Sequence, residues 1–389
     1  MADNPAKISG KHRLGWILIL LLIIGSLAGT VVFYSHTEMS YKMYTSDTIT
    51  YPQARVTRIL SEELSDAETG DDRQLGIQYL EVKILDGKQK GDTVQIENYL
   101  STTHNIPVRE GTKIILKADQ PENAEPYYSV YNYSRSGGYL AMLVIFAAIV
   151  LLVGRMKGLR SLFSLGYILA LVMGFLIPAI YTGWDPIGST LLVAALSITV
   201  SMVLLNGLSV KTLIACVSTV LGIFLSAILF YLVQKIVSIS GYNLSEAEEL
   251  LLISQSTGLK IRSLLFAGTM ISCLGALIDM SMSVVSPLWE IKEQHPETGP
   301  AEIYRSGIRI GQDLIGTMCS TLLLAFAGTA IVTLLVVISY GTAANQILHS
   351  DYMAIEIAQG LTGSMAVVLA IPLSAGFSAL GSRYLTAGK

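Results

Sequence analysis

Two aspartates lie inside long apolar runs in the last third of the chain. Asp279 falls in the apolar run that follows Arg262, and Asp313 lies near the start of the next apolar run. An ionised carboxylate in hydrocarbon is costly, so such residues usually face the interior of a helix bundle or a water-filled cavity. We therefore interpret Asp279 and Asp313 as candidates for binding or carrying a cation.

Small polar residues accompany both aspartates at helical spacing. Ser272 lies seven residues before Asp279 and Ser283 four residues after it, which places all three on one helical face. Carboxylates and hydroxyls are hard oxygen ligands or proton carriers, fit for H⁺, Na⁺ or a divalent cation, so the pattern leaves the identity of a bound ion or metal open. The predicted ion-binding residues are Asp279, Asp313, Ser272, Ser283, Thr317 and Ser320, and the small residues beside them that would let a partner helix approach are Gly275, Gly311 and Gly316.

A structural role is the alternative for both acids. Arg309 stands four residues before Asp313 on the same predicted helix, so the two side chains could form a salt bridge. Asp279 could pair with Arg309 or Arg305 in the same way, and serines and threonines in membrane helices are commonly packing residues. The ion site and the structural salt bridge therefore both stay open.

The composition predicts a membrane protein. Of the 389 residues 52% are hydrophobic and only 14% are charged, and the mean hydropathy is +0.55, far more apolar than a soluble domain of this length. The net charge of −3 and the absence of a basic run argue against nucleic-acid binding. The lipid bilayer is therefore the expected environment, and no cofactor is expected.

The apolar runs predict a mainly α fold, a polytopic bundle of about eight transmembrane helices with a small β-domain after the first of them. We expect three domains: 1–35, a cytoplasmic N-terminus and retained first anchor; 36–135, an extracytoplasmic β-rich domain; and 136–389, a seven-helix transmembrane domain. The predicted spans are 14–34, 139–153, 162–181, 187–205, 213–237, 264–285, 308–339 and 353–380.

The polar segment 36–135 has the pattern of short strands. Four β-branched, partly alternating stretches, 54–60, 79–85, 92–100 and 112–118, are separated by glycine-containing turns. They predict a small antiparallel barrel or sandwich resembling an OB-fold. The tyrosine-rich stretch 127–139 is expected to be a connector at the lipid headgroups.

Loop charges predict the orientation. Lysine and arginine are concentrated in the loops that would be cytoplasmic, which places both termini in the cytoplasm of a plasma-membrane protein. A helix from Pro300 to Ser339 would be about 60 Å long, so it must project from the membrane or bend near Gly307 or Gly311. In an outer loop, Ser245 and Glu248 have capping-box spacing and predict a short surface helix.

Three stretches resemble the YibE/F-like family of multi-pass bacterial membrane proteins. They are GALIDMSMS, IGQDLIGTMCSTLLLAFAG and GSMAVVLAIPLSA, and the resemblance extends from about residue 138 onward. It implies a bacterial plasma-membrane protein, a transporter often encoded as a pair of related permease-like subunits. The implied partner is a homologous subunit or a second copy of the chain, and no substrate is implied.

Three classes of function follow. A secondary transporter or permease would use the acid pair for a small cation, with broken helices at Pro178, Gly275 and Gly311. A non-transporting complex subunit or envelope sensor would act through its β-domain. An intramembrane aspartyl protease would need two aspartates on adjacent helices, but Asp313 lies in Gly-Gln-Asp rather than the Gly-x-Gly-Asp of presenilin-like enzymes. No Walker P-loop or HExxH motif occurs, and we expect a permease rather than an enzyme.

Overall fold

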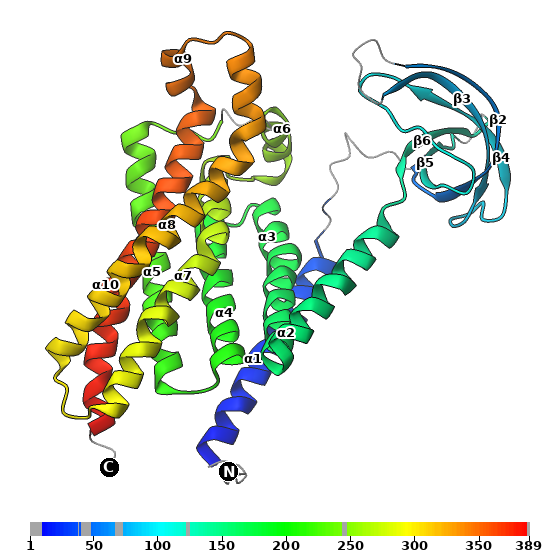
Figure 1. The fold of residues 1–389 in the computed structure, drawn as a ribbon. Coiled ribbons are helices and arrows are strands. Elements are labelled where there is room, and N and C mark those ends of the chain that lie inside the picture. The colour runs from blue at the N-terminus through cyan, green and yellow to red at the C-terminus, as the bar shows by residue number, and fades with distance from the viewer. Residues whose placement is uncertain are drawn as a thin grey trace. The chain divides into compact units, whose positions relative to one another are not determined.

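The structure is a computed structural model, and it describes residues 10–37, 39, 48–66, 73–121, 125–242 and 247–386. The chain is mainly helical, with a small curled β-domain after the first helix, which confirms the predicted fold class (Figure 1). It divides into two units, one of Met1–Met39 with Leu151–Lys389 and one of Ser40–Val150.

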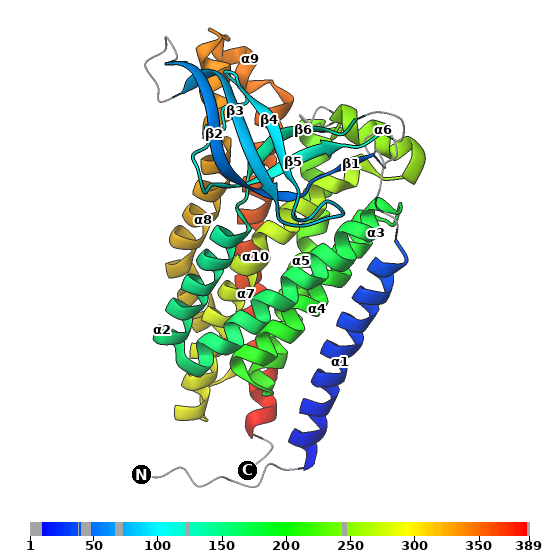
Figure 2. The ribbon, with the colours of Figure 1, turned by 90° about the vertical axis from the view of Figure 1, so that its right-hand side faces the viewer.

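The β-domain is a single antiparallel sheet that curls on itself (Figure 2). Strand β2 pairs with β3 and β5, β3 pairs with β4, and β5 pairs with β6 and with the short β1. Because β4 lies next to β6, the sheet forms a partly open barrel with the strand order of an OB-fold. The strands are β1 (Ile49–Thr50), β2 (Gln53–Asp66), β3 (Gln74–Ile84), β4 (Thr93–Leu100), β5 (Lys113–Asp119) and β6 (Tyr127–Tyr133).

Apolar and polar residues alternate along the strands of this sheet. In β5 the side chains of Ile114, Leu116 and Ala118 are fully buried, while their neighbours along the strand point outward. Gly87 and Gly111 have φ of 79° and 85°, a backbone conformation that glycine adopts readily in the tight turns predicted here. The four predicted strands are thus present as β2 to β5.

The prediction that residues 127–139 form a tyrosine-rich connector is wrong for the first half of this stretch. Residues Tyr127–Tyr133 form strand β6, with Val130 buried in the core and Tyr127 and Tyr131 exposed on the other side. Aromatic residues favour strands, and this alternation is the pattern of a half-buried strand. These tyrosines therefore belong to a strand of the barrel rather than to a connector.

Seven helices in the described part of the chain are long and apolar enough to cross a membrane, so the protein is a multi-pass membrane protein. Helix α10 lies against α5, α7 and α8, and these four helices hold most of the buried apolar core (Figures 1 and 2). The helices are α1 (Gly10–Ser35), α2 (Ser136–Leu171), η1 (Val172–Leu176), α3 (Ile177–Tyr181), α4 (Pro186–Asn206), α5 (Val210–Val237), α6 (Ala247–Thr257), α7 (Ile261–Gln294), α8 (Pro300–Ser339), α9 (Ala344–Leu348) and α10 (Asp351–Thr386).

The predicted spans 139–153 and 162–181 lie in one helical stretch, Ser136–Tyr181, and are separated by a sharp kink at Arg155 instead of the expected loop. Only Arg155 within α2 leaves helical geometry, with φ 47° and ψ −127°. The expected loop 154–161 contains no proline, so helical hydrogen bonding resumes directly after the kink. The seven candidate helices therefore contain all eight predicted spans, two of them within the stretch Ser136–Tyr181.

Helix α1 packs against η1, a π-helical stretch that precedes Pro178. The Ser26 and Tyr167 hydroxyls are 2.9 Å apart, and the Phe33 ring lies 5.2 Å from that of Phe175. A Cβ atom on Gly174 would lie 2.4 Å from Thr30 Cγ2, so only glycine allows this close approach. These contacts pack α1 into the helix bundle; its retention stays a prediction.

Helices α7 and α8 form an antiparallel hairpin with a turn of only five residues, 295–299. The buried ammonium of Lys292 donates hydrogen bonds to the carbonyl oxygens of Pro296 and Thr298, at 2.6 and 2.8 Å. As predicted, Pro300 begins α8, where its missing N–H costs nothing. Most of the charged stretch between the predicted spans 264–285 and 308–339 is therefore helix.

Neither helix breaks at a glycine. Helix α7 continues through Gly275 and α8 through Gly311, so the expected discontinuities at these two positions are wrong. Instead, Gly307 and Gly311 form a GxxxG face on α8: a Cβ on Gly307 would lie 2.6 Å from Ala375 Cβ, and one on Gly311 would lie 2.1 Å from Ile371 Cγ2. Because these glycines have no side chain, they permit the close packing of α8 on α10.

The short surface helix predicted in the loop after α5 is present as α6. Glu248 lies in its first turn, where a carboxylate interacts favourably with the helix dipole. Ser245, the predicted capping partner, lies outside the described residues.

Candidate functional site

One face of α7 is polar and open over much of its length. Gly268, Ser272, Gly275 and Asp279 are exposed, whereas the residues on the opposite side of the helix are buried against α5 and α10. Ser283 and the half-buried Ser286 continue the same face. From Ser272 to Ser286 this polar face extends about 21 Å, roughly two thirds of the hydrocarbon thickness of a bilayer.

Asp279 has no compensating charge in the part of the chain that the structure describes. Its carboxylate takes part in no ion pair or hydrogen bond there, and neither Arg305 nor Arg309 lies within salt-bridge distance. Two turns further along, Lys211 at the start of α5 donates a hydrogen bond to Ser286 Oγ at 3.2 Å. A basic side chain thus closes the end of the polar face nearer to the α7–α8 turn.

The second predicted cluster lies on the exposed side of α8. Arg309, Asp313, Gly316, Thr317 and Ser320 are all exposed and follow one another at helical spacing. Asp313, like Asp279, is in no hydrogen bond or ion pair among the described residues. Nothing in this geometry joins the two carboxylates to each other, so their pairing stays a prediction.

The three predicted glycines differ in what surrounds them. Gly311 is buried against Ile371 of α10, which gives it a packing role inside the chain. A Cβ atom added to Gly275 or Gly316 would meet no other atom within 4 Å, and both glycines lie beside Asp279 and Asp313 on the open faces. These two leave room next to the acids instead of packing helices of the chain together.

A third intramembrane acid, Glu356, lines a cavity between α7, α8 and α10. The cavity has a volume of about 270 Å³, and its polar lining comes from Ser272, Thr329, Glu356 and Gln359. The Glu356 carboxylate is half-buried, and its Oε2 is shielded from solvent with no hydrogen-bond partner among the described residues. Ser272 therefore belongs both to this cavity and to the polar face that contains Asp279.

The sequence-based prediction does not include Glu356, because the span 353–380 is predicted from the hydropathy of the whole segment. The signal was present: Glu356, Gln359 and Gly360 have the spacing of one helical face within a membrane-length helix. What the sequence could not show is that Ser272 and Thr329 from two other helices would line the same cavity.

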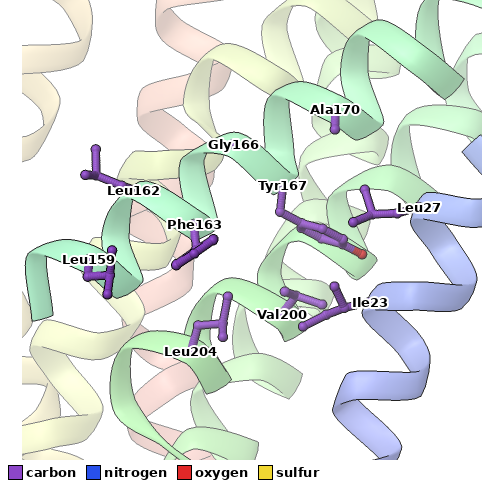
Figure 3. A pocket seen from close by; sticks show the side chains of 10 residues that line it. All are labelled: Ile23, Leu27, Leu159, Leu162, Phe163, Gly166, Tyr167, Ala170, Val200 and Leu204. Atoms are coloured by element: carbon purple, nitrogen blue, oxygen red, sulfur yellow. The ribbon is translucent and has the colours of Figure 1, made fainter. Parts of the chain in front are cut away.

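A larger cavity is almost wholly apolar. It has a volume of about 470 Å³ and lies between α1, the last part of α2 and α4, with the Tyr167 ring reaching toward Ile23 and Leu27 of α1 (Figure 3). The Tyr167 hydroxyl is engaged by Ser26. This lining suits an acyl chain or another apolar group, and it offers no site for a cation.

The β-domain has a polar groove of about 390 Å³, lined in part by Asp86, Lys88, Gln89 and Gln120. Asp86 Oδ1 accepts a hydrogen bond from the backbone N–H of Gln53, so this carboxylate helps to stabilise the β-domain. Nearby, Tyr128 donates to Gln89, and burial raises the pKa of the Tyr128 phenol above its usual value. The groove could hold a small polar ligand.

A helical membrane bundle with polar faces on two adjacent helices, and an OB-like domain inserted after its first helix, defines the class of this protein. Two family models match the chain: YibE/F-like protein over residues 142–383 and YibE/F family N-terminal domain over residues 43–133. The chain therefore belongs to the YibE/F-like family, as its motifs predicted. No curated protein and no solved structure matches it.

Proposed function

We propose that the chain is a secondary transporter or permease of the bacterial plasma membrane, in which the polar face of α7 binds and carries a small cation. The observation that supports this is the uncompensated Asp279 in the middle of that face. A carboxylate that only stabilises helix packing would have a positively charged side chain beside it, as in a buried ion pair. An acid without one, flanked by serines and glycine, is instead free to meet a cation or a proton.

Counterflow into proteoliposomes tests the proposal. Purified protein is reconstituted and loaded in turn with a panel of monovalent cations, divalent cations and metabolites, and uptake of the matching labelled species is measured against protein-free vesicles. We expect protein-dependent exchange of at least one small cation. Exchange of none of the panel would contradict the proposal and favour a non-transporting role that depends on the β-domain.

The orientation is a separate prediction that rests on the loop charges. Cysteines are introduced singly at Glu63 of β2 and Glu297 of the α7–α8 turn, both exposed, in a background in which Cys216, Cys273 and Cys319 are replaced by alanine. In intact cells an impermeant maleimide should label the cysteine at position 63, and it should label that at position 297 only after lysis. Labelling of position 297 from outside would reverse the proposed topology.

A further inference from the structure

The oxygen atoms around Glu356 are arranged to accept rather than to donate. Ser272 Oγ already donates its hydrogen to the Gly268 carbonyl at 2.8 Å, and Thr329 Oγ1 donates to the Phe326 carbonyl at 2.7 Å. Both hydroxyl oxygens therefore have only lone pairs left to offer to the cavity. No group among the described residues donates to Glu356 Oε2, and apart from the Gln359 amide the polar groups of the lining can only accept; the lining also has no positively charged residue.

This donor set fits a cation with hard-oxygen preferences. The cavity offers a carboxylate oxygen from Glu356, an amide oxygen from Gln359 and two hydroxyl oxygens, which are the ligand types that Na⁺, Mg²⁺ and Ca²⁺ take in proteins. A soft or nitrogen-preferring metal would find no thiolate or imidazole among the residues that line it. The chemistry therefore selects the alkali and alkaline-earth cations.

The charge of the cavity selects among these cations. Glu356 is the single ionisable residue in its lining, so a monovalent cation would make the site neutral, whereas a divalent cation would leave a net positive charge at membrane depth. We propose that Glu356, Gln359, Ser272 and Thr329 form a binding site for a small monovalent cation of the Na⁺ type. The inference rests on the proposed function in one respect: this ion would be the one that the transporter carries or couples to.

The location of the site agrees with such a role. Ser272 lies about 10 Å from Asp279 along α7, so an ion that leaves the cavity reaches the polar face that contains Asp279 without crossing an apolar segment of that helix. The three helices that supply the ligands, α7, α8 and α10, also pack against one another. Binding would therefore tie α7, α8 and α10 to one another and should stabilise the fold.

Sodium binding to the full-length protein in lipid nanodiscs tests the site directly. The midpoint of thermal unfolding is measured in NaCl and in choline chloride of equal ionic strength, together with equilibrium binding of ²²Na⁺. We expect the midpoint to rise with the logarithm of Na⁺ concentration above the dissociation constant, and one Na⁺ to bind per chain. Glu356→Gln, which keeps the size of the side chain and removes its charge, should abolish both effects.

A matched pair of threonine variants keeps the test informative if Glu356→Gln folds poorly. Thr329→Val removes one proposed ligand and should weaken Na⁺ binding about tenfold, the effect of a lost interaction worth about 1.4 kcal/mol. Thr321→Val on the same helix removes a hydroxyl with the same kind of backbone hydrogen bond, to Thr317 at 2.8 Å, but outside the cavity lining, and should leave the affinity unchanged.

The outcomes separate this site from the proposed function. Sodium stabilisation that survives in Glu356→Gln, or equal weakening by Thr329→Val and Thr321→Val, would overturn the site. Stabilisation of the wild type by Mg²⁺ or Ca²⁺ but not by Na⁺ would overturn its monovalent character. Sodium binding without any counterflow would support the site and refute the proposed transport function. Counterflow by a protein that binds no Na⁺ would support the transport function and refute the site.

Discussion

Asp279→Asn is expected to reduce cation exchange about 100-fold or more while the protein stays folded and inserted in the membrane. The amide keeps the size of the side chain and removes the charge that would bind the ion. Because Asp279 has no ion-pair partner among the described residues, its neutralisation should leave no buried cation uncompensated. Exchange into proteoliposomes and the thermal unfolding midpoint of the same preparation measure the two effects.

Glu290→Gln is the matched control for this experiment. Glu290 is exposed on the same helix, eleven residues after Asp279 and beyond the polar face, so its substitution should change neither exchange nor stability. A structural role for Asp279 predicts the opposite pattern. Asp279→Asn would then lower the unfolding midpoint, and the double variant Asp279→Asn with Arg309→Gln would restore both stability and activity.

Gly311→Val is expected to destabilise the helix bundle by about 2 kcal/mol or more, because overpacking a close contact forces side chains and backbone to shift. The first added carbon alone would lie 2.1 Å from Ile371 Cγ2, and Ile371 is itself buried and branched at Cβ. The thermal unfolding midpoint of the purified protein should fall, and proteolysis between α8 and α10 should become faster at a fixed temperature.

Gly328→Val on the same helix provides the control for the change in helix propensity. An added Cβ at Gly328 meets no atom within 4 Å, so this variant carries the same glycine-to-valine difference without the clash. Equal destabilisation by Gly311→Val and Gly328→Val would show that the packing of α8 on α10 has no special requirement for glycine.

Helix and strand positions could be predicted well where periodicity was strong. The span 308–339 and its helical extension back to Pro300 followed from hydropathy and the position of proline, and α8 matches them. The interruption near Arg155 followed from the basic residues between the spans 139–153 and 162–181, but its form did not, because hydropathy cannot distinguish a kink at one residue from a loop. Strand β6 was missed because tyrosines suit both a strand and a membrane interface.

The candidate site was less predictable because it depends on which helices are neighbours. Spacing placed Ser272, Asp279 and Ser283 on one face of α7, which is a property of a single helix. The same argument could not separate Gly311 from Gly316, although one packs on α10 and the other is open. Nor could it place Thr329 and Glu356 beside Ser272, since their approach is set by tertiary packing across three helices.

Lys292 holds the turn between the two acid-bearing helices. Its ammonium group donates hydrogen bonds to the carbonyl oxygens of Pro296 and Thr298. These bonds stabilise the short turn that connects α7 to α8. Both helices run unbroken past their aspartates. If the chain transports as proposed, we expect the switch of access between the two sides of the membrane to be a joint tilt of α7 and α8 about the close contact between Gly307 and Ala375.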